Sequence, residues 1–250
     1  MCRKKIFSIF IFGAILAQLL ILLTHDQQIR HLSGETQKVV HSRDGFVQVT
    51  VDLQVSSMPP IEFKGSGTLI STKDNKNYIL TANHLCNPKL PSFITETVED
   101  KQVFVTDFTG EAYPTGIVFN SEIDDLCLLE FIGTTNAVPT PIASQPPEVN
   151  EKVFAFASPS GFYAPYVIPF FDGYYTGDIA ESGRVSSVYT IPAVGGSSGA
   201  AILNDSGEIV GVIHSALVDF HHITLASTHT DVVMFLNEYA DLSGVILLEP

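Results

Sequence analysis

Short apolar runs separated by polar turns make up most of the chain from residue 46 onwards. Clusters of turn-forming residues, such as 74–77 and 204–207, divide the runs from one another. About a dozen short strands without long helices indicate an all-β sandwich or barrel. The strand-like runs are 46–53, 67–72, 78–82, 102–106, 126–131, 152–157, 184–191, 201–203, 209–215 and 223–227.

One helix is predicted close to the C-terminus. Apolar residues recur there at helical spacing, and Thr230 precedes them as the expected N-cap. The residues of this apolar face are Val232, Val233, Phe235, Leu236 and Tyr239.

The N-terminal residues have the pattern of a targeting element. Arg3, Lys4 and Lys5 precede residues 6–24, which carry no charge. A helix of that length spans about 28 Å, close to the thickness of a bilayer core of about 30 Å. The basic flank predicts that its N-terminal end stays in the cytoplasm and the rest lies outside. We expect residues 1–24 to be an uncleaved signal anchor, since the apolar run is longer than that of a cleaved signal peptide, the alternative that would give a secreted protein.

The remainder of the chain is acidic. The sequence has 13 basic and 27 acidic residues, a net charge of −14. Three of the basic residues precede the apolar run, so residues 25–250 carry −17. This charge disfavours nucleic acid and anionic lipid as partners of that part. Residues 25–44 are polar and without periodicity, and we expect a linker there.

A glycine-rich turn at residues 195–201 carries the first candidate chemistry. Its sequence, Gly-Gly-Ser-Ser-Gly-Ala-Ala, lies between two apolar runs. A serine in such a turn has an exposed hydroxyl, and its small neighbours let backbone N–H groups converge on one point. The turn can therefore supply a nucleophile and an oxyanion hole together, although this short pattern alone is also typical of an ordinary tight turn.

Two residues with the matching chemistry lie upstream, each at the edge of an apolar run. They are His84, after Tyr78-Ile79-Leu80-Thr81-Ala82, and Asp125, before Leu126-Cys127-Leu128-Leu129. Serine needs an imidazole to accept its proton, and the imidazole needs a carboxylate that holds its tautomer. The order His, Asp, Ser is the one that the chymotrypsin template has.

These blocks resemble those of trypsin-like (chymotrypsin-fold) serine proteases over about residues 44–240. Residues 80–86 are similar to the family's T-A-A-H-C block, 125–129 to D-[IL]-A-[LV]-L, and 196–199 to G-[DN]-S-G. Within the family the chain resembles the HtrA/Deg-type branch, whose G-N-P-x-G phrase is similar to Ala157-Ser158-Pro159-Ser160-Gly161.

The resemblance implies two six-stranded antiparallel β-barrels. With the elements predicted from the apolar pattern, the expected chain has an N-terminal anchor before the barrels and a short helix after them. The protease domain is expected at residues 45–240, with barrels at about 45–145 and 146–240. Residues 241–250 then form a C-terminal tail, too short for the PDZ domain that is common in the HtrA/Deg-type branch.

The chain also departs from the family pattern. Ser197 stands where clip-activated proteases have an acid that receives a freed N-terminal amine, so activation by clipping is not expected. Cys86 matches a half-cystine of the family, but its usual partner near residues 65–67 is missing. Cys86 and Cys127 flank His84 and Asp125 and could lie close together, where an exported chain could oxidise them. Two buried free thiols are the simpler interpretation.

Two further clusters have ordinary structural explanations. His214, His221 and His222 lack the Cys or acidic partners of a metal site at the usual spacing, so no metal and no cofactor are expected. Seven of the fourteen residues at 162–175 are aromatic. A hairpin packing its own rings over the barrel is one interpretation, and an exposed apolar surface for substrate, a subunit or the membrane is the other.

Together these observations predict a membrane-anchored serine endopeptidase whose catalytic domain lies outside the cytoplasm. Ser198 attacks the scissile carbonyl, His84 transfers the proton and Asp125 orients His84. The N–H groups of Gly196 and Ser198 form the oxyanion hole. The alternative is an inactive relative that serves as a binding module. Protein or peptide is the expected substrate, and oligomerisation is left open.

The same resemblance assigns the specificity pocket to four residues: Pro192, Ile213, His214 and Ala216. No acid stands at Pro192 to receive Arg or Lys, so we expect cleavage after small or medium apolar residues. In the competing interpretation His214 faces the pocket and accepts Glu. Strand alternation places His214 opposite Ile213 and disfavours this.

Overall fold

The computed structural model describes residues 39, 42–56, 58–181, 183–217 and 219–248. The expected anchor, residues 1–24, and most of the expected linker lie outside the described residues. In the part that is described, no helix is long and apolar enough to cross a membrane.

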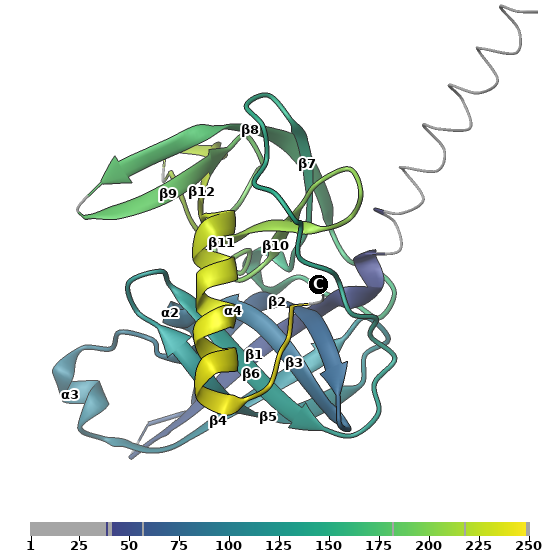
Figure 1. The fold of residues 1–250 in the computed structure, drawn as a ribbon. Helices are drawn as coiled ribbons and strands as arrows, with labels where there is room; N and C mark the ends of the chain where they lie inside the picture. Colours follow the sequence, from purple (N-terminus) through teal and green to yellow (C-terminus); the bar gives the residue numbers. More distant parts are fainter. Residues whose placement is uncertain (1–38, 40–41, 57, 182, 218, 249–250) are drawn as a thin grey trace, which may run out of the picture. The chain divides into compact units, whose positions relative to one another are not determined.

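The first half of the described chain forms a closed antiparallel barrel of six strands in the order β1-β2-β3-β6-β5-β4 (Figure 1). The strands are β1 (Phe46–Val55), β2 (Ile61–Lys73), β3 (Lys76–Ala82), β4 (Val98–Asp107), β5 (Ala112–Ser121) and β6 (Leu126–Ile132). Along β1, side chains pointing into the barrel are buried, as the residues Val47, Val49, Val51 and Leu53 show.

A second closed barrel follows, in the order β10-β11-β12-β9-β8-β7. Its strands are β7 (Lys152–Phe156), β8 (Phe170–Glu181), β9 (Arg184–Tyr189), β10 (Ala201–Leu203), β11 (Ile209–Leu217) and β12 (Phe220–Ser227). The expectation of an all-β chain with two six-stranded barrels is therefore confirmed.

Two strands of these barrels, β5 and β8, were absent from the apolar runs of the sequence. In β5 the side chains alternate between exposed and half-buried, and none is fully buried, so no apolar run marks the strand. β8 begins inside the aromatic segment, at Phe170. Some rings of this segment pack over the barrel and others are exposed, so each interpretation of the segment holds for part of it. Tyr163 packs against Phe46, and Tyr175 packs against Tyr189. The exposed rings are those of Phe162, Tyr166, Phe170 and Tyr174.

The helices are short except for the last. They are η1 (Arg43–Gly45), α2 (Asn83–Cys86), α3 (Ser92–Thr95), η2 (Pro159–Gly161) and α4 (His229–Ser243). The expected N-cap Thr230 is wrong. Thr228 caps α4 instead, because its hydroxyl accepts from Asp231 N–H while the Asp231 carboxylate accepts from Thr228 N–H, a capping box. Gly244 ends the helix in the left-handed conformation.

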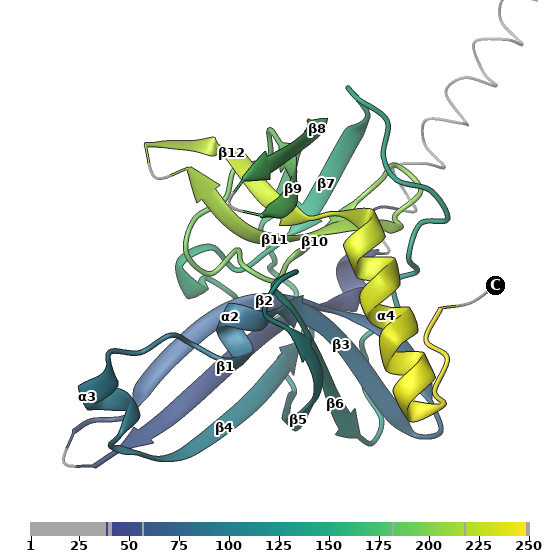
Figure 2. The same ribbon diagram turned by 60° about the vertical axis from the view of Figure 1, so that its left-hand side comes forward.

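Helix α4 runs alongside both barrels (Figure 2). One apolar cluster joins residues of the first barrel, such as Tyr78 and Leu128, to residues of the second, such as Leu203 and Val212. Phe235 and Leu236 of α4 belong to the same cluster. The two barrels and the helix thus share one apolar core, and this core holds the first barrel in place against the second.

Candidate active site

His84 lies in α2, the single turn that follows β3 directly. Its backbone N–H donates to Asp125 Oδ1 at 2.8 Å, and its ring Nδ1 lies 2.8 Å from Asp125 Oδ2. Asp125 therefore holds both the backbone and the ring of His84. The His84 side chain is 38% exposed and that of Asp125 14%, so the ring edge remains accessible while the carboxylate is sheltered.

Asp125 comes immediately before β6, and the antiparallel pairing of β3 with β6 brings it beside His84. Ala82 and Leu126 are partners in that ladder, so the residues that follow and precede them meet at the same edge. Asn83 N–H donates to the Asp125 carbonyl oxygen, and Asp125 has a positive φ of 54°. Burial on its own would raise the pKa of the Asp125 carboxyl, but hydrogen bonds and charge from His84 outweigh it and leave the pKa below its ordinary value.

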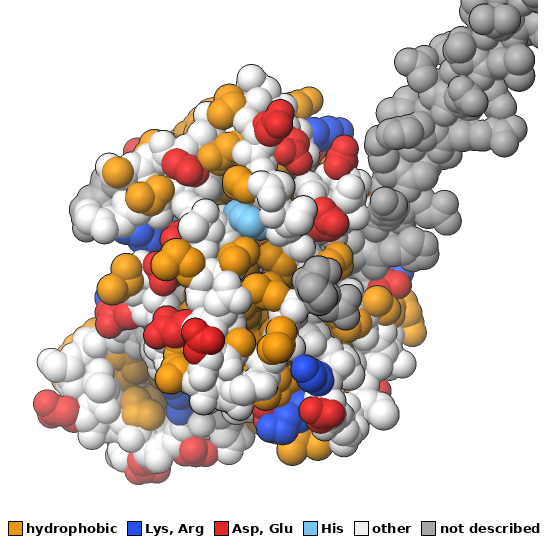
Figure 3. Space-filling view, in the orientation of Figure 1, with side chains coloured by type: hydrophobic (Ala, Val, Ile, Leu, Met, Phe, Trp, Pro, Cys, Tyr) orange, Lys and Arg blue, Asp and Glu red, His pale blue; other side chains and the backbone are white. Residues whose placement is uncertain are grey.

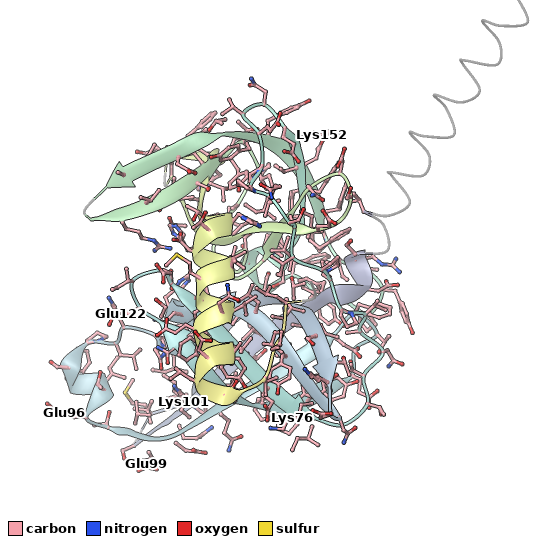
Figure 4. The ribbon with its side chains drawn as sticks, in the orientation of Figure 1. Lys76, Glu96, Glu99, Lys101, Glu122 and Lys152 are labelled. Atoms are coloured by element: carbon pink, nitrogen blue, oxygen red, sulfur yellow. A yellow bond between two sulfur atoms is a disulfide. The ribbon has the colours of Figure 1, made fainter. Side chains whose placement is uncertain are left out.

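A disulfide joins Cys86 to Cys127, with 6.6 Å between their Cα atoms. The expectation of two free thiols is therefore wrong. Thr81 of β3 pairs with Cys127 of β6, and the short α2 turn brings Cys86 back over this pair. The Cys86 carbonyl accepts a hydrogen bond from Nζ of Lys101, which is labelled in Figure 4. The disulfide ties the turn that carries His84 to the strand that follows Asp125.

Ser198 lies in the loop between β9 and β10 and belongs to the second barrel. The loop is bound to the first barrel, because Ser66 N–H of β2 donates to the Ser198 carbonyl oxygen at 2.8 Å. Gly199 has φ +84°, and a Cβ there would lie 2.0 Å from the Ser66 carbonyl oxygen, so only glycine fits. Within the described residues, no hydrogen bond joins Ser198 Oγ to the His84 ring. Such contacts often tighten only when substrate is bound.

The turn that carries Ser198 also contains the two N–H groups expected to form the oxyanion hole. Among the described residues, the N–H groups of Gly196 and Ser198 donate to no acceptor of the protein. Gly196 has φ +91°, and a Cβ there would lie 2.4 Å from the Ser158 carbonyl oxygen. The Ser197 hydroxyl is buried and accepts from Val194 N–H at 3.3 Å.

A pocket of about 270 Å³ opens next to Ser198. Ile213 and Ala216, two of the four residues expected there, line it, whereas Pro192 and His214 are outside its lining. Leu217 and His221 also line the pocket and lie outside the two segments expected there, the residues just before the nucleophile and the strand up to Ala216. The other lining residues lie within those segments: Ala193, Val194, Gly195 and Ser215. His221 is the titratable side chain of this lining. It comes from β12, which pairs with β11 at Leu217 and Phe220.

His214 lies on the other side of β11 from the pocket. The strand has an irregularity between Ile213 and Ser215, and the ring Nε2 of His214 lies 3.2 Å from Ser186 Oγ. Burial, and after it the charge of Arg184, lower the pKa of His214 to about 4 in spite of the opposing charge of Asp125. His214 is therefore a neutral imidazole near pH 7.

The surface that Figure 3 draws follows the acidic composition of the sequence. Figure 3 shows Asp and Glu side chains distributed over one face, with few Lys and Arg. No group of three or more His, Cys, Asp and Glu residues in the described part is arranged to hold a metal ion.

Residues 65–212 match the model of the trypsin-like peptidase domain, a range that includes His84, Asp125 and Ser198. No curated protein matches the chain in sequence.

Solved structures with the same fold include an inactive mutant form of Rv3671c from M. tuberculosis H37Rv. Its identity is 16%, with 83% of this chain and 92% of that chain covered and a TM-score of 0.60. A serine endoprotease from Yersinia pestis is 22% identical, with 84% of this chain and 67% of that chain covered and a TM-score of 0.62. These likenesses show the two-barrel fold, and the family model covers more than half of the chain. The chain therefore belongs to the trypsin-like peptidases and is a trypsin-like serine protease.

Proposed function

We propose that the protein is an endopeptidase that uses His84, Asp125 and Ser198 as a catalytic triad and forms an acyl-enzyme. The observation that carries the proposal is the double attachment of His84 to Asp125, through the backbone N–H and through ring Nδ1. Because Nδ1–H donates its hydrogen bond to the Asp125 carboxylate, the ring's Nε2 is left as the proton acceptor.

In the proposed mechanism His84 Nε2 takes the proton of Ser198 as Oγ attacks the scissile carbonyl carbon. The oxyanion that forms accepts from the N–H groups of Gly196 and Ser198, the two donors that are not used within the described protein. His84 then gives its proton to the leaving amine, and the acyl-enzyme is hydrolysed by water in the reverse sequence. Asp125 stays ionised throughout, which its lowered pKa favours.

A fluorophosphonate probe tests the nucleophile. We expect Ser198→Ala to abolish labelling and the neighbouring Ser197→Ala to retain most of it, since Ser197 Oγ is buried and occupied by Val194 N–H. Labelling that survives in Ser198→Ala contradicts the assignment. A wild-type protein that is folded but never labelled points instead to a binding module with a protease fold.

The adjacent pair Asp124 and Asp125 offers a matched control for the carboxylate. Asp125→Asn is expected to lower kcat by about 10⁴-fold, because the amide favours the wrong tautomer of His84. Asp124→Asn is expected to have little effect, since the Asp124 carboxylate binds Ser121 Oγ rather than the His84 ring. Steady-state kinetics on a peptide substrate measure both, and the reverse order of effects moves the role to Asp124.

We also propose that the enzyme cleaves after small or medium apolar residues. The pocket beside Ser198 is lined mainly by apolar side chains, among them Ile213, Ala216 and Leu217. Burial of an aliphatic side chain there contributes about 1.5–3 kcal/mol, whereas no lining carboxylate would offset the desolvation of Arg or Lys.

Cleavage of a peptide library tests this preference, with Val, Ala or Leu expected before the cleaved bond. Dominant cleavage after Glu overturns it. Two variants then locate the cause: loss of Glu cleavage in His214→Ala assigns it to the buried histidine, and loss in His221→Ala assigns it to the pocket lining.

Finally, we propose that the domain works outside the cytoplasm and stays attached to a membrane through residues 1–24. The basic residues 3–5 before the uncharged run support this orientation, and a structural disulfide is typical of an oxidising compartment. External protease should remove the domain from intact spheroplasts of a bacterial expression host, and carbonate washing should leave it in the membrane. A soluble product that begins near residue 25 contradicts the uncleaved anchor.

A further inference from the structure

Two fully buried serines lie directly beneath the nucleophile loop, and the proposed mechanism does not use them. Ser66 belongs to β2 of the first barrel, and Ser158 follows β7 of the second. Ser66 Oγ donates to the Gly196 carbonyl oxygen at 2.8 Å and accepts from Ser158 N–H at 2.9 Å. Ser158 Oγ lies 3.0 Å from the Gly65 carbonyl oxygen and 3.3 Å from that of Gly196, so its proton is shared between them.

The loop that these serines hold contains a tight turn from Val194 to Ser197. Ser197 N–H donates to the Val194 carbonyl oxygen at 2.9 Å, and the third residue, Gly196, has φ +91°. A positive φ at this position marks a type II turn. Rotation of the central peptide, Gly195–Gly196, converts a type II turn into type I with the same closing hydrogen bond. Gly196 N–H then points the opposite way and is lost from the oxyanion hole.

The orientation of that central peptide depends on η2, the short helix whose N-cap is Ser158. Ser160 N–H donates to the Gly195 carbonyl oxygen, which holds the peptide in its type II orientation. Ser160 itself has φ +54°, and Gly161 N–H donates to the Ser158 carbonyl oxygen at 2.9 Å. Ser158 is itself held by both serine hydroxyls, because its N–H donates to Ser66 Oγ and its own Oγ donates to the Gly65 carbonyl oxygen, and it thereby anchors the backbone from which Ser160 reaches the turn.

We infer that Ser66 and Ser158 are positioning residues that keep the Gly196 N–H directed into the oxyanion hole. The inference rests on the proposed function of Ser198. It also gives this chain an internal means of ordering the nucleophile loop, since Ser197 offers no carboxylate for a freed N-terminal amine. A preorganised donor accelerates the reaction because no reorganisation is needed as charge develops.

The test compares kcat and KM of the full-length protein for Ser66→Ala, Ser158→Ala and Ser187→Ala on one peptide substrate. Ser66→Ala removes the shortest bond to Gly196 and the acceptor of Ser158 N–H, so its kcat is expected to fall most, by about 10- to 100-fold. The kcat of Ser158→Ala should fall less than that of Ser66→Ala. KM should stay within about twofold in both, because the lost interaction acts in the transition state.

The control Ser187→Ala removes a hydroxyl that is buried to a similar degree, in the second barrel, to which Ser158 also belongs. Ser187 Oγ binds Asp178 Oδ1 at 2.7 Å and does not touch the nucleophile loop. Affinity for a peptide aldehyde, whose adduct carries an oxyanion, is expected to fall in parallel with kcat in the Ser66 and Ser158 variants only. In the double variant Ser66→Ala/Ser158→Ala, the fold-decrease in kcat should be smaller than the product of the two single fold-decreases, since both hydroxyls contact the Gly196 carbonyl oxygen.

Ser66→Cys covers the case in which Ser66→Ala does not fold. The thiol keeps the shape with a weaker donor, so its kcat is expected between those of the wild type and the alanine variant. A kcat for the Ser66 variants no lower than that of Ser187→Ala, with a wild type that the fluorophosphonate labels, contradicts this inference alone. A wild type that is not labelled contradicts the proposed function.

Discussion

Two histidines, His84 and His214, act on the Asp125 carboxylate, and only one of them contacts it. His84 donates to it twice, whereas His214 bonds to Ser186 and influences Asp125 through charge. Because the folded pKa of Asp125 is lowered, its pairing stabilises the fold above the ordinary carboxyl pKa of 3.8 and is lost as the pH falls through the folded value.

His214 makes a second contribution to the pH dependence of stability. Its pKa falls from 6.5 to about 4 on folding, so the unfolded chain binds more protons between these values. The free energy of unfolding should therefore rise as the pH rises from about 4 to about 6.5, and the stability gained is fully present above 6.5. We expect His214→Gln to flatten this slope, measured by urea unfolding at several pH values. Exposed His222→Gln is the matched control, and an equal slope in both variants contradicts the assignment.

The local motifs of the sequence predicted His84 and Asp125 as partners, and the structure brings the two into contact. The roles of Ser198 and Gly196 stay predictions. The sequence did not predict His221 in the pocket, because the pairing of β11 with β12 brings that side chain there. The role of Ser66 could have been suspected from the sequence. Ser66 stands in the stretch where the usual partner of Cys86 is missing, and the structure shows a hydroxyl bound to the nucleophile loop at that position.

Among the elements, α2 and β6 are joined by the one crosslink of the described residues, Cys86–Cys127. The bridge closes a loop with a sequence separation of 41. Loop closure of that size stabilises the folded state by about 4 kcal/mol. The flanking positions of the two cysteines around His84 and Asp125 indicated that they could lie close together. Whether they bond depends on the pairing of β3 with β6, which the sequence does not show.

Urea unfolding with and without dithiothreitol tests this crosslink. Reduction is expected to lower the free energy of unfolding by about 4 kcal/mol at most, through the gain in entropy of the unfolded chain. The double variant Cys86→Ala/Cys127→Ala should be less stable than the wild type and insensitive to the reductant. Equal stability of the oxidised and reduced wild type argues against a structural role.

At the scale of the whole described domain, α4 connects the two barrels through their shared apolar cluster. Phe235 is 2% exposed and packs against Phe119 of the first barrel, with ring centroids 4.9 Å apart. Its neighbour Met234 is 65% exposed. The helix therefore has one buried and one exposed residue at adjacent positions. Substituting each in turn separates the contribution of core packing to stability from other effects of changing the helix.

Phe235→Ala is expected to lower the free energy of unfolding by about 3–5 kcal/mol, because it removes a large buried ring and leaves a cavity. Met234→Ala should change it by less than about 0.5 kcal/mol. Far-UV circular dichroism and tyrosine fluorescence should report one common urea transition, since both barrels share the core. Two separate transitions in the wild type contradict the shared core.

The closure of both barrels also affects where the enzyme can cleave itself. A closed barrel has no free edge strand, and proteases cut exposed connecting segments rather than paired strands. The connection between β6 and β7 has an exposed part at residues 144–150, in which Val149 is 61% exposed and fits the proposed specificity. Autolysis during storage is therefore expected there. The shared core would hold the nicked halves together as one native particle, and a denaturing gel would separate them into two fragments.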